Sequence, residues 1–280
     1  MIRSKSFKDK VAIVTGGSAG LGAALVSELA HRGAKTIICD KNQEKAAILI
    51  DVLAAQGVLH IPDISVVDVT DYEAMTDAVQ EVVRREGKID LIINNAGILI
   101  VGEVRDMEIA HFRKLVEINI MGVVHGSTAA FKIMERQGYG QIVNISSISG
   151  LVANPLYAAY SMTKHGVVGF STALREEGKE LGVGVTVICP GTLQTDIFSS
   201  GAVINAPKGI VFKESALASM SATKAAKIII SKIPKNPRIV VFPLWALFIW
   251  ILERIHPILT APLHRVVLRN FRMKRGEKVV

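Results

Sequence analysis

The first 190 residues alternate short apolar runs with longer stretches of helical spacing, and this alternation constrains the fold more than any other feature. Runs rich in valine and isoleucine recur at residues 11–14, 36–39, 65–69, 91–94, 141–145 and 185–189. Between the first two runs, Leu21, Leu25 and Leu29 share one helical face, and Gly33 follows as a stop. Strands that are apolar throughout are typical of parallel sheets buried on both faces. The pattern predicts an α/β protein with a doubly wound sheet.

The carboxyl ends of these strands are where ligands bind in a doubly wound sheet, so the residues after each run are site candidates. Beyond residue 191 the pattern loosens. Residues 192–222 have no clear period, which predicts a lid over the substrate. A helix at 221–233 and a last strand at 238–242 follow.

The charge is unevenly distributed along the 280 residues, although the net charge is +8. Residues 201–280 hold 14 basic and 3 acidic side chains, a net of +11, whereas the first 200 residues hold 19 and 22, a net of −3. A basic surface confined to one end does not favour nucleic acid as a partner.

The two cysteines, Cys39 and Cys189, each end an apolar run and are expected to be small buried side chains. Neither they nor the seven scattered histidines have the spacing of metal ligands, so we expect no metal. With no disulfide framework and no apolar segment near the N-terminus, the sequence favours a cytoplasmic location.

A glycine-rich turn joins the first strand to the first helix, with glycines at 16, 17, 20 and 22. Glycine lets a pyrophosphate approach the N–H groups at the start of the helix, although the spacing is not G-x-G-x-x-G. The alternative is a tight turn selected for packing.

Asp40 ends the second run, about 20 residues further on, where a carboxylate binds the adenosine ribose and repels a 2′-phosphate. A solvated loop acid is the alternative, and the adjacent Lys41 would soften the repulsion. Asp68, in the third run, either caps the next helix or faces the adenine.

Tyr160 and Lys164 are the strongest pair for chemistry, because an i, i+4 spacing places them on one helical face. A phenol ordinarily titrates near pH 10, and a neighbouring ammonium lowers that pKa, which suits a general base. Tyr157 has Ser161 at the same spacing and no cation, so we interpret it as a substrate-pocket wall. Ser147 follows the fifth run and is placed to hold a substrate oxygen.

Taken in order, these motifs resemble the short-chain dehydrogenase/reductase family over roughly residues 8–242. They are T-G-x-x-x-G-x-G at Thr15–Gly22, D-V at Asp68–Val69, N-N-A-G at Asn94–Gly97, a helical asparagine at 119, a serine in N-I-S-S, Y-x-x-x-K at Tyr160–Lys164, and P-G at 190–191. The resemblance implies one Rossmann-like domain over residues 1–242, with about seven parallel strands and helices on both faces. It also implies nicotinamide chemistry, and an acid at Asp40 implies NAD rather than NADP.

The resemblance assigns roles to individual residues. The implied catalytic residues are Asn119, which would hold a proton-relaying water, with Ser147, Tyr160 and Lys164; Ser147, Tyr157 and Tyr160 would contact the substrate. The implied cofactor contacts are Gly16, Ser18, Gly20, Leu21, Gly22, Asp40, Lys41, Asp68, Val69, Asn95, Ala96, Gly97, Tyr160, Lys164, Pro190, Gly191, Thr192 and Thr195. Dimers and tetramers are common in the family, so a homodimer or homotetramer is expected.

Residues 243–280 depart from the family, many of whose members end soon after the last strand. An apolar run at 239–252, broken by Pro243, is too short to cross a bilayer. In the helical stretch 263–275, Leu263, Val266, Val267 and Phe271 share a face bordered by arginines at 265, 269 and 272. Residues 243–275 therefore favour peripheral membrane association, with packing on the enzyme or a partner subunit as the alternative.

The sequence predicts an NAD-dependent alcohol dehydrogenase or carbonyl reductase acting on a lipophilic substrate of retinoid, steroid or fatty-acyl type, because the C-terminal segment would add an apolar wall. An NADPH-dependent 3-ketoacyl reductase is the alternative within enzymes. A membrane-associated nucleotide-binding scaffold or sensor is the alternative of another class, and the intact Ser147, Tyr160 and Lys164 set argues against it.

Overall fold

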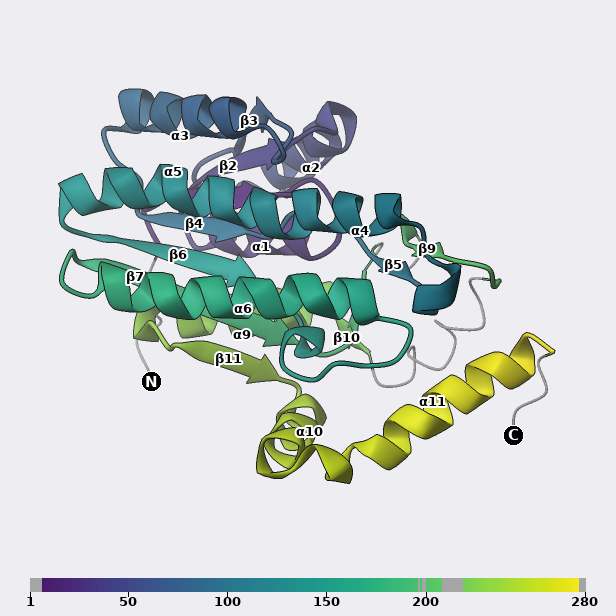
Figure 1. The fold of residues 1–280 in the computed structure, drawn as a ribbon. Coiled ribbons are helices and arrows are strands. Elements are labelled where there is room, and N and C mark those ends of the chain that lie inside the picture. Colours follow the sequence, from purple (N-terminus) through teal and green to yellow (C-terminus); the bar gives the residue numbers. More distant parts are fainter. Residues whose placement is uncertain (1–6, 196, 198–199, 208–218, 277–280) are drawn as a thin grey trace.

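The computed structural model describes residues 7–195, 197, 200–207 and 219–276. Its centre is a parallel sheet of seven strands in the order β11-β7-β6-β4-β1-β2-β3 (Figure 1). The strands are β1 (Val11–Thr15), β2 (Lys35–Asp40), β3 (Asp63–Val66), β4 (Leu91–Asn94), β6 (Gly140–Ile145), β7 (Val183–Pro190) and β11 (Ile239–Phe242). The predicted doubly wound parallel sheet is confirmed.

Helices cover both faces of this sheet, as predicted. One layer holds α3 (Tyr72–Glu86), α5 (Gly122–Gln137) and α6 (Ala158–Gly178), drawn in front of the sheet in Figure 1, with α4 (Ile109–Val116) leading into α5. The other layer holds α1 (Gly20–His31), α2 (Gln43–Ala55) and α9 (Ala222–Lys232). Each apolar strand can therefore bury both of its faces.

Successive side chains of a strand pack into the two helix layers in turn. Ile13 and Ile37 pack towards α3 and α5, whereas Val14 and Ile38 pack towards α1 and α9. All four are at most 3% exposed. Burying one such side chain stabilises the fold by about 1.5–3 kcal/mol, which is why the strands are apolar without alternation.

The third strand is displaced from its predicted range. β3 ends at Val66 and lies at the sheet edge, paired with β2 alone, so the prediction of a strand over 65–69 is wrong. Val67 and Val69 are buried in the loop beyond it, packed with Met75 and Ala78 of α3. An apolar run does not distinguish a strand from a loop that packs on a helix.

The chain reverses direction across the sheet between β1 and β4, and this switch point opens a crevice at the carboxyl edge. Because β11 pairs with β7, residues 239–242 deliver the C-terminal segment to the same edge. There α10 (Leu244–Ile255), the short helix η5 (Pro257–Leu259) and α11 (Ala261–Lys274) follow. Pro243 separates β11 from α10, as predicted. Within the described ranges, no helix combines the length and apolarity needed to span a membrane.

Three short strands lie in the described part of residues 192–222. β8 (Leu193–Gln194) pairs in parallel with β10 (Met220–Ser221), and β9 (Ala202–Val203) pairs in parallel with β5 (Ile100–Val101), which follows β4 in the chain. Residues 196, 198–199 and 208–218 of the predicted lid lie outside the described residues. The lid, and the division into a domain at 1–242 and a segment at 243–280, stay predictions.

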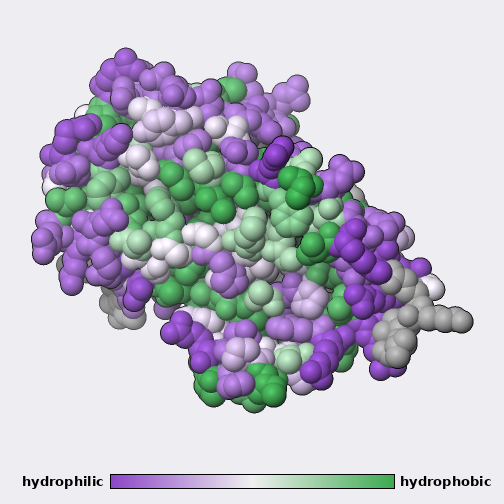
Figure 2. Space-filling view, viewed as in Figure 1, coloured by the Kyte–Doolittle hydropathy of each residue, from purple (hydrophilic) through white to green (hydrophobic). Residues whose placement is uncertain are grey.

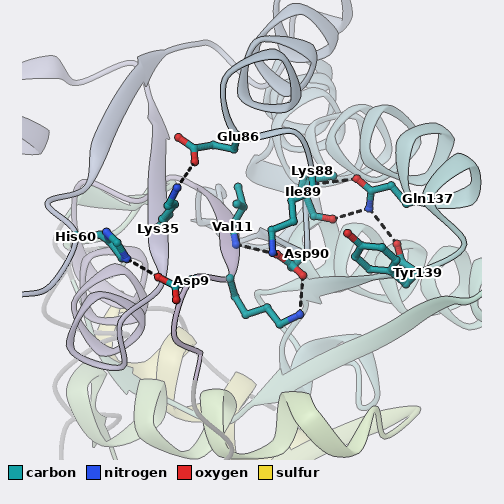
Figure 3. A network of polar contacts seen from close by, with 11 residues as sticks. Asp9, Val11, Lys35, His60, Glu86, Lys88, Ile89, Asp90, Gln137 and Tyr139 are labelled. Atoms are coloured by element: carbon teal, nitrogen blue, oxygen red, sulfur yellow. Dashed lines mark hydrogen bonds and ion pairs between the residues drawn. The ribbon is translucent and has the colours of Figure 1, made fainter.

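A polar network ties the amino ends of the strands together, opposite the crevice (Figure 3). Asp90, just before β4, accepts hydrogen bonds from Lys10 Nζ at 2.7 Å and from the Val11 backbone N–H at 3.0 Å. Lys88 lies 3.1 Å from the same carboxylate. Burial raises the pKa of Asp90, but these hydrogen bonds outweigh it and hold the pKa below its usual value. The network fixes one end of the sheet and leaves the other free for the site.

Candidate active site

A cavity of about 650 Å³ lies at the carboxyl edge of the sheet. Its walls come from the loops after β1, β2, β4, β6 and β7, and from α6, α10 and α11. Every residue that the sequence predicted for the site lines this cavity except Gly22 and Asn119. Residues more than 150 positions apart are thus brought to one place.

The glycine-rich turn is shaped by close backbone contacts. Gly16 has φ of +61°, and a Cβ atom there would lie 2.8 Å from the Cα of Ala96. A Cβ on Gly22 would lie 1.9 Å from the carbonyl oxygen of Gly16, so Gly22 packs the first helical turn beneath the loop. Because Ala19 caps α1 without a side-chain hydrogen bond, the N–H groups at the helix start remain available to an anion.

Thr15 and Asn95 join the loops after β1 and β4. Thr15 Oγ1 accepts hydrogen bonds from the backbone N–H groups of Asn95 at 3.0 Å and Ala96 at 3.1 Å. Asn95 Nδ2 donates to the carbonyl oxygens of Thr15 and Gly16, each at 3.1 Å. The side chain of Asn95 therefore supports the glycine turn. Sequence reasoning assigned no role to Thr15, although it begins the glycine motif.

Asp40 is held at the cavity by its neighbours. Its Oδ2 accepts hydrogen bonds from the Ser18 backbone N–H at 3.0 Å and from Ser18 Oγ at 2.6 Å. Its Oδ1 accepts one from the Asn42 N–H at 2.9 Å. The predicted cofactor residue Ser18 thus orients the predicted ribose ligand. Lys41 is exposed, and its Nζ lies 3.9 Å from the carboxylate of Asp68.

Asp68 does not cap the helix that follows it. The cap of α3 is Asp71, whose side chain accepts a hydrogen bond from the Ala74 N–H at 2.9 Å. Asp68 instead accepts hydrogen bonds from the N–H and hydroxyl of Thr70, and the backbone bond is the main cause of its lowered pKa. Asp68 lines the cavity as a carboxylate, and its contact with adenine stays a prediction.

Ser147, Tyr160 and Lys164 come together at the cavity as predicted. Tyr160 lies in the first turn of α6, and Ser147 follows β6, near enough for its side chain to affect the pKa of Tyr160. Lys164, one turn later, has its Nζ 5.6 Å from the centre of the Tyr160 ring and donates to the Ile145 carbonyl at 3.0 Å. The ring of Tyr157 packs edge-on against Tyr160, with centroids 6.5 Å apart.

Burial is the largest cause of the pKa shifts of Tyr157, Tyr160 and Lys164. It raises the pKa of Tyr160, and the nearby side chain of Ser147 only partly opposes this rise. Burial also raises the pKa of Tyr157 to about 12 and lowers the pKa of Lys164 to about 8. The pKa of Tyr160 is therefore raised and not lowered as expected, because the phenol and the ammonium are both enclosed where a charge is poorly solvated.

Asn119 lies behind the cavity, fully buried in a short π-helical turn over Glu117–Met121. Its Oδ1 accepts a hydrogen bond from the Ile98 N–H at 2.8 Å, and its Nδ2 donates to the Ile98 carbonyl at 3.0 Å and to Thr163 Oγ1 at 3.3 Å. The side chain thus joins the loop after β4 to α6. The water-relay role stays a prediction.

The C-terminal helices supply an apolar wall. Trp245 and Ile249 of α10, with Leu263, Val267 and Phe271 of α11, line the cavity. A Cβ on Gly191 would lie 2.6 Å from Trp245 Cζ2, so the glycine admits the indole. Asn270 and Lys274, unassigned from the sequence, share this helical face. Val266, predicted to share a helical face with these residues, is 54% exposed and does not line the cavity.

Two ion pairs hold α11 on the body of the protein. Arg272 Nη2 lies 2.6 Å from Glu103 Oε2, and Arg275 Nη1 lies 2.6 Å from Asp106 Oδ2. The hydrogen bond from Arg272 is the main cause of the lowered pKa of Glu103. Phe271, directly before Arg272, is only 3% exposed, and the guanidinium of Arg275 lies 5.4 Å from the centre of its ring. Arg272, predicted to border the apolar face, instead contacts the enzyme.

Comparison with known proteins identifies the fold and the family. Residues 10–202 match the family described as short chain dehydrogenase. The chain belongs to the short-chain dehydrogenase/reductase family. It is 32% identical to rat dehydrogenase/reductase SDR family member 7B, over 84% of this chain and 74% of that protein. It is 36% identical to the uncharacterized oxidoreductase YusZ of Bacillus subtilis, over 68% of each chain.

Solved structures agree with the architecture. Levodione reductase superposes with a TM-score of 0.76 at 27% identity, covering 84% of this chain and 96% of that one. A short-chain dehydrogenase/reductase from Burkholderia phymatum, solved in complex with NAD, gives a TM-score of 0.81 at 24% identity, covering 91% and 96%; at that identity only the fold is shared. The chain is therefore an NAD(P)-dependent oxidoreductase of this family.

The residues at the cavity fit a nicotinamide dinucleotide. The turn at Gly16 leaves no room for a side chain, and the start of α1 offers uncapped N–H groups to a pyrophosphate. Asp40 would hold the ribose next to it. Gly191 and Thr192, with Tyr160 and Lys164, would surround the nicotinamide at the other end of the cavity.

Proposed function

We propose that this protein transfers a hydride between NAD(H) and a lipophilic secondary alcohol or ketone. One observation carries the proposal. The cavity that joins the glycine turn and Asp40 to Ser147 and Tyr160 is also lined by apolar side chains of α10 and α11. A single space therefore offers a dinucleotide site, a proton-transfer group and an apolar wall.

The preference for NAD is argued from charge. The carboxylate of Asp40 is fixed at the cavity by Ser18 and Asn42, where it would accept hydrogen bonds from ribose hydroxyls and repel a 2′-phosphate. Residues 16–21 contain no basic side chain that would pair with such a phosphate. Lys41 is 73% exposed, so water screens its charge.

The chain's own residues account for the proton transfer. The hydroxyls of Ser147 and Tyr160, which both line the cavity, would hold the substrate oxygen from two sides. Tyr160 would take the hydroxyl proton of an alcohol, or return it to a ketone. Lys164, beneath the Tyr160 ring, would stabilise the resulting phenolate. When bound, NAD supplies the hydride acceptor and a positively charged ring.

The apolar wall supports a lipophilic substrate of retinoid, steroid or fatty-acyl type. Trp245, Ile249 and Phe271 would contact the part of the substrate remote from its reacting carbon, and burying each such contact favours binding by about 25 cal/mol per Å² of apolar area. Tyr157, half-buried beside Tyr160, would form the wall nearest the chemistry.

The test is a turnover screen of the full chain across lipophilic secondary alcohols and short polyols, with NAD and NADP side by side. We expect NADH production from the lipophilic alcohols. Turnover of small hydrophilic polyols alone would contradict the substrate class. Reduction of 3-ketoacyl substrates with NADPH, and none with NADH, would replace the proposal with a 3-ketoacyl reductase.

A further inference from the structure

The outer side of the C-terminal segment, away from the cavity, is also apolar. Leu244, Phe248, Ile251 and Ile255 recur along α10 at helical spacing, and Ile258 and Leu259 of η5 continue them; each is between 46% and 83% exposed. We call these six residues the C-terminal apolar face. None of them lines the cavity, so the substrate site does not account for them. In Figure 2, hydrophobic side chains gather at the lower edge of the molecule, where Figure 1 places α10.

The helices that carry or follow this face also carry basic side chains. Arg254 lies in the last turn of α10, with its guanidinium 5.9 Å from the ring of Trp250. Arg265 and Arg269 are exposed on α11. In the whole stretch from 244 to 276, Glu253 is the one acidic residue of the sequence. The charge around the face is therefore positive, complementary to an anionic surface.

The length of α10 decides how such a face could meet a bilayer. Twelve residues of helix extend about 18 Å, less than the roughly 30 Å of a hydrocarbon core. A short helix with an apolar stripe and basic flanks lies in the plane of the interface, with its apolar side chains among the lipid headgroups and acyl chains.

We propose that the C-terminal apolar face docks the protein in plane on the surface of an anionic lipid bilayer, with Arg254, Arg265 and Arg269 against the lipid phosphates. The same segment is attached to the body through Arg272 and Arg275, which contact Glu103 and Asp106. Docking would therefore bring the α11 wall of the cavity to the membrane. This last consequence rests on the proposed function, because lipophilic alcohols partition into the bilayer.

Vesicle co-sedimentation of the full chain tests the docking. We expect binding to phosphatidylcholine vesicles with about 30 mol% phosphatidylserine and much weaker binding to phosphatidylcholine alone. The double variant Phe248→Glu/Ile251→Glu should lower the partition coefficient at least tenfold. Arg254→Gln/Arg265→Gln/Arg269→Gln should lower it about 100-fold, since each basic residue near an anionic surface contributes about a factor of five.

The matched control is Ile48→Glu/Val52→Glu on α2. Those side chains are 64% and 46% exposed, against 61% and 46% for Phe248 and Ile251. This control should bind vesicles like the wild type. Unchanged NAD binding and unchanged thermal melting of each variant would establish that it is folded.

Three results would overturn the docking: no binding of the wild type to anionic vesicles, equal losses in the α10 and α2 variants, or a lipid-free oligomer, detected by sedimentation velocity, that the α10 variant dissociates. The last result would assign the face to a second copy of the chain. Vesicle binding without turnover of any lipophilic alcohol would leave the docking intact and contradict the proposed function.

Discussion

Asp40 illustrates how a single residue acquires its task from its neighbours. Alone, a carboxylate after a strand is as consistent with a solvated loop as with a ribose ligand. The two hydrogen bonds from Ser18 and the one from Asn42 fix both of its oxygens beside the glycine turn. The structure thus adds orientation to a residue that the sequence predicted by position.

Replacing Asp40 with serine should shift the cofactor preference towards NADP. Two charges about 4 Å apart interact by about 1 kcal/mol in water and about 4 kcal/mol near a protein surface. We therefore expect the ratio of kcat/KM for NADP to that for NAD to rise at least fivefold. Steady-state kinetics with both cofactors measure the ratio. Asp51→Ser, which removes an exposed carboxylate of α2 that does not line the cavity, is the control. An unchanged ratio in Asp40→Ser would remove Asp40 from cofactor selection.

For single residues, the sequence predicted a contact between two residues one helical turn apart. It could not choose between two similar residues that lie close together in the chain. Tyr160 and Lys164 are joined by one helical turn, so their contact follows from spacing alone. The cap of α3 was not decided in the same way, because Asp68 and Asp71 both precede the helix and only geometry selects Asp71. The hydrogen bonds of the Asn119 amide could not be predicted either, because its partner Ile98 lies in the loop after β4, far from Asn119 in the local pattern.

At the scale of elements, strand β11 determines what the C-terminal segment can do. Its parallel pairing with β7 aligns Phe242 with Pro190, so α10 begins beside the end of β7. Trp245 then reaches Gly191, and α11 continues along the cavity. The sequence predicted an amphipathic helix here but could not choose between membrane and enzyme as its partner. The structure places its inner face on the cavity.

Trp245→Ala should lower kcat/KM for lipophilic alcohols by about 10- to 100-fold, because losing a buried large apolar side chain removes about 1.5–3 kcal/mol of binding. The reaction of a small secondary alcohol should change much less. Phe248→Ala is the matched control on the same helix, since Phe248 is 61% exposed and does not line the cavity. Equal effects of the two changes would contradict the assignment of the wall.

At the scale of the whole molecule, the two ends of the sheet are built for different purposes. Asp90 and its lysines tie the amino ends of the strands. The carboxyl ends carry loops that leave a cavity of about 650 Å³. The apolar runs predicted this difference between the two ends of the sheet, because the carboxyl ends of parallel strands lie at one edge. The position of α11 could not be predicted, because its ion pairs join it to Glu103 and Asp106, each 169 residues earlier in the sequence than its partner arginine.

The central claim is that Tyr160 transfers the proton in a hydride exchange with NAD. Tyr160→Phe removes one buried hydroxyl and keeps the ring, so the fold and the cavity should remain. The most direct measurement is NADH production from a lipophilic secondary alcohol by this variant, alongside NAD binding by calorimetry. We expect kcat to fall at least 100-fold, the usual minimum for general acid–base catalysis, with the NAD dissociation constant nearly unchanged. NADH production at the wild-type rate would contradict the mechanism.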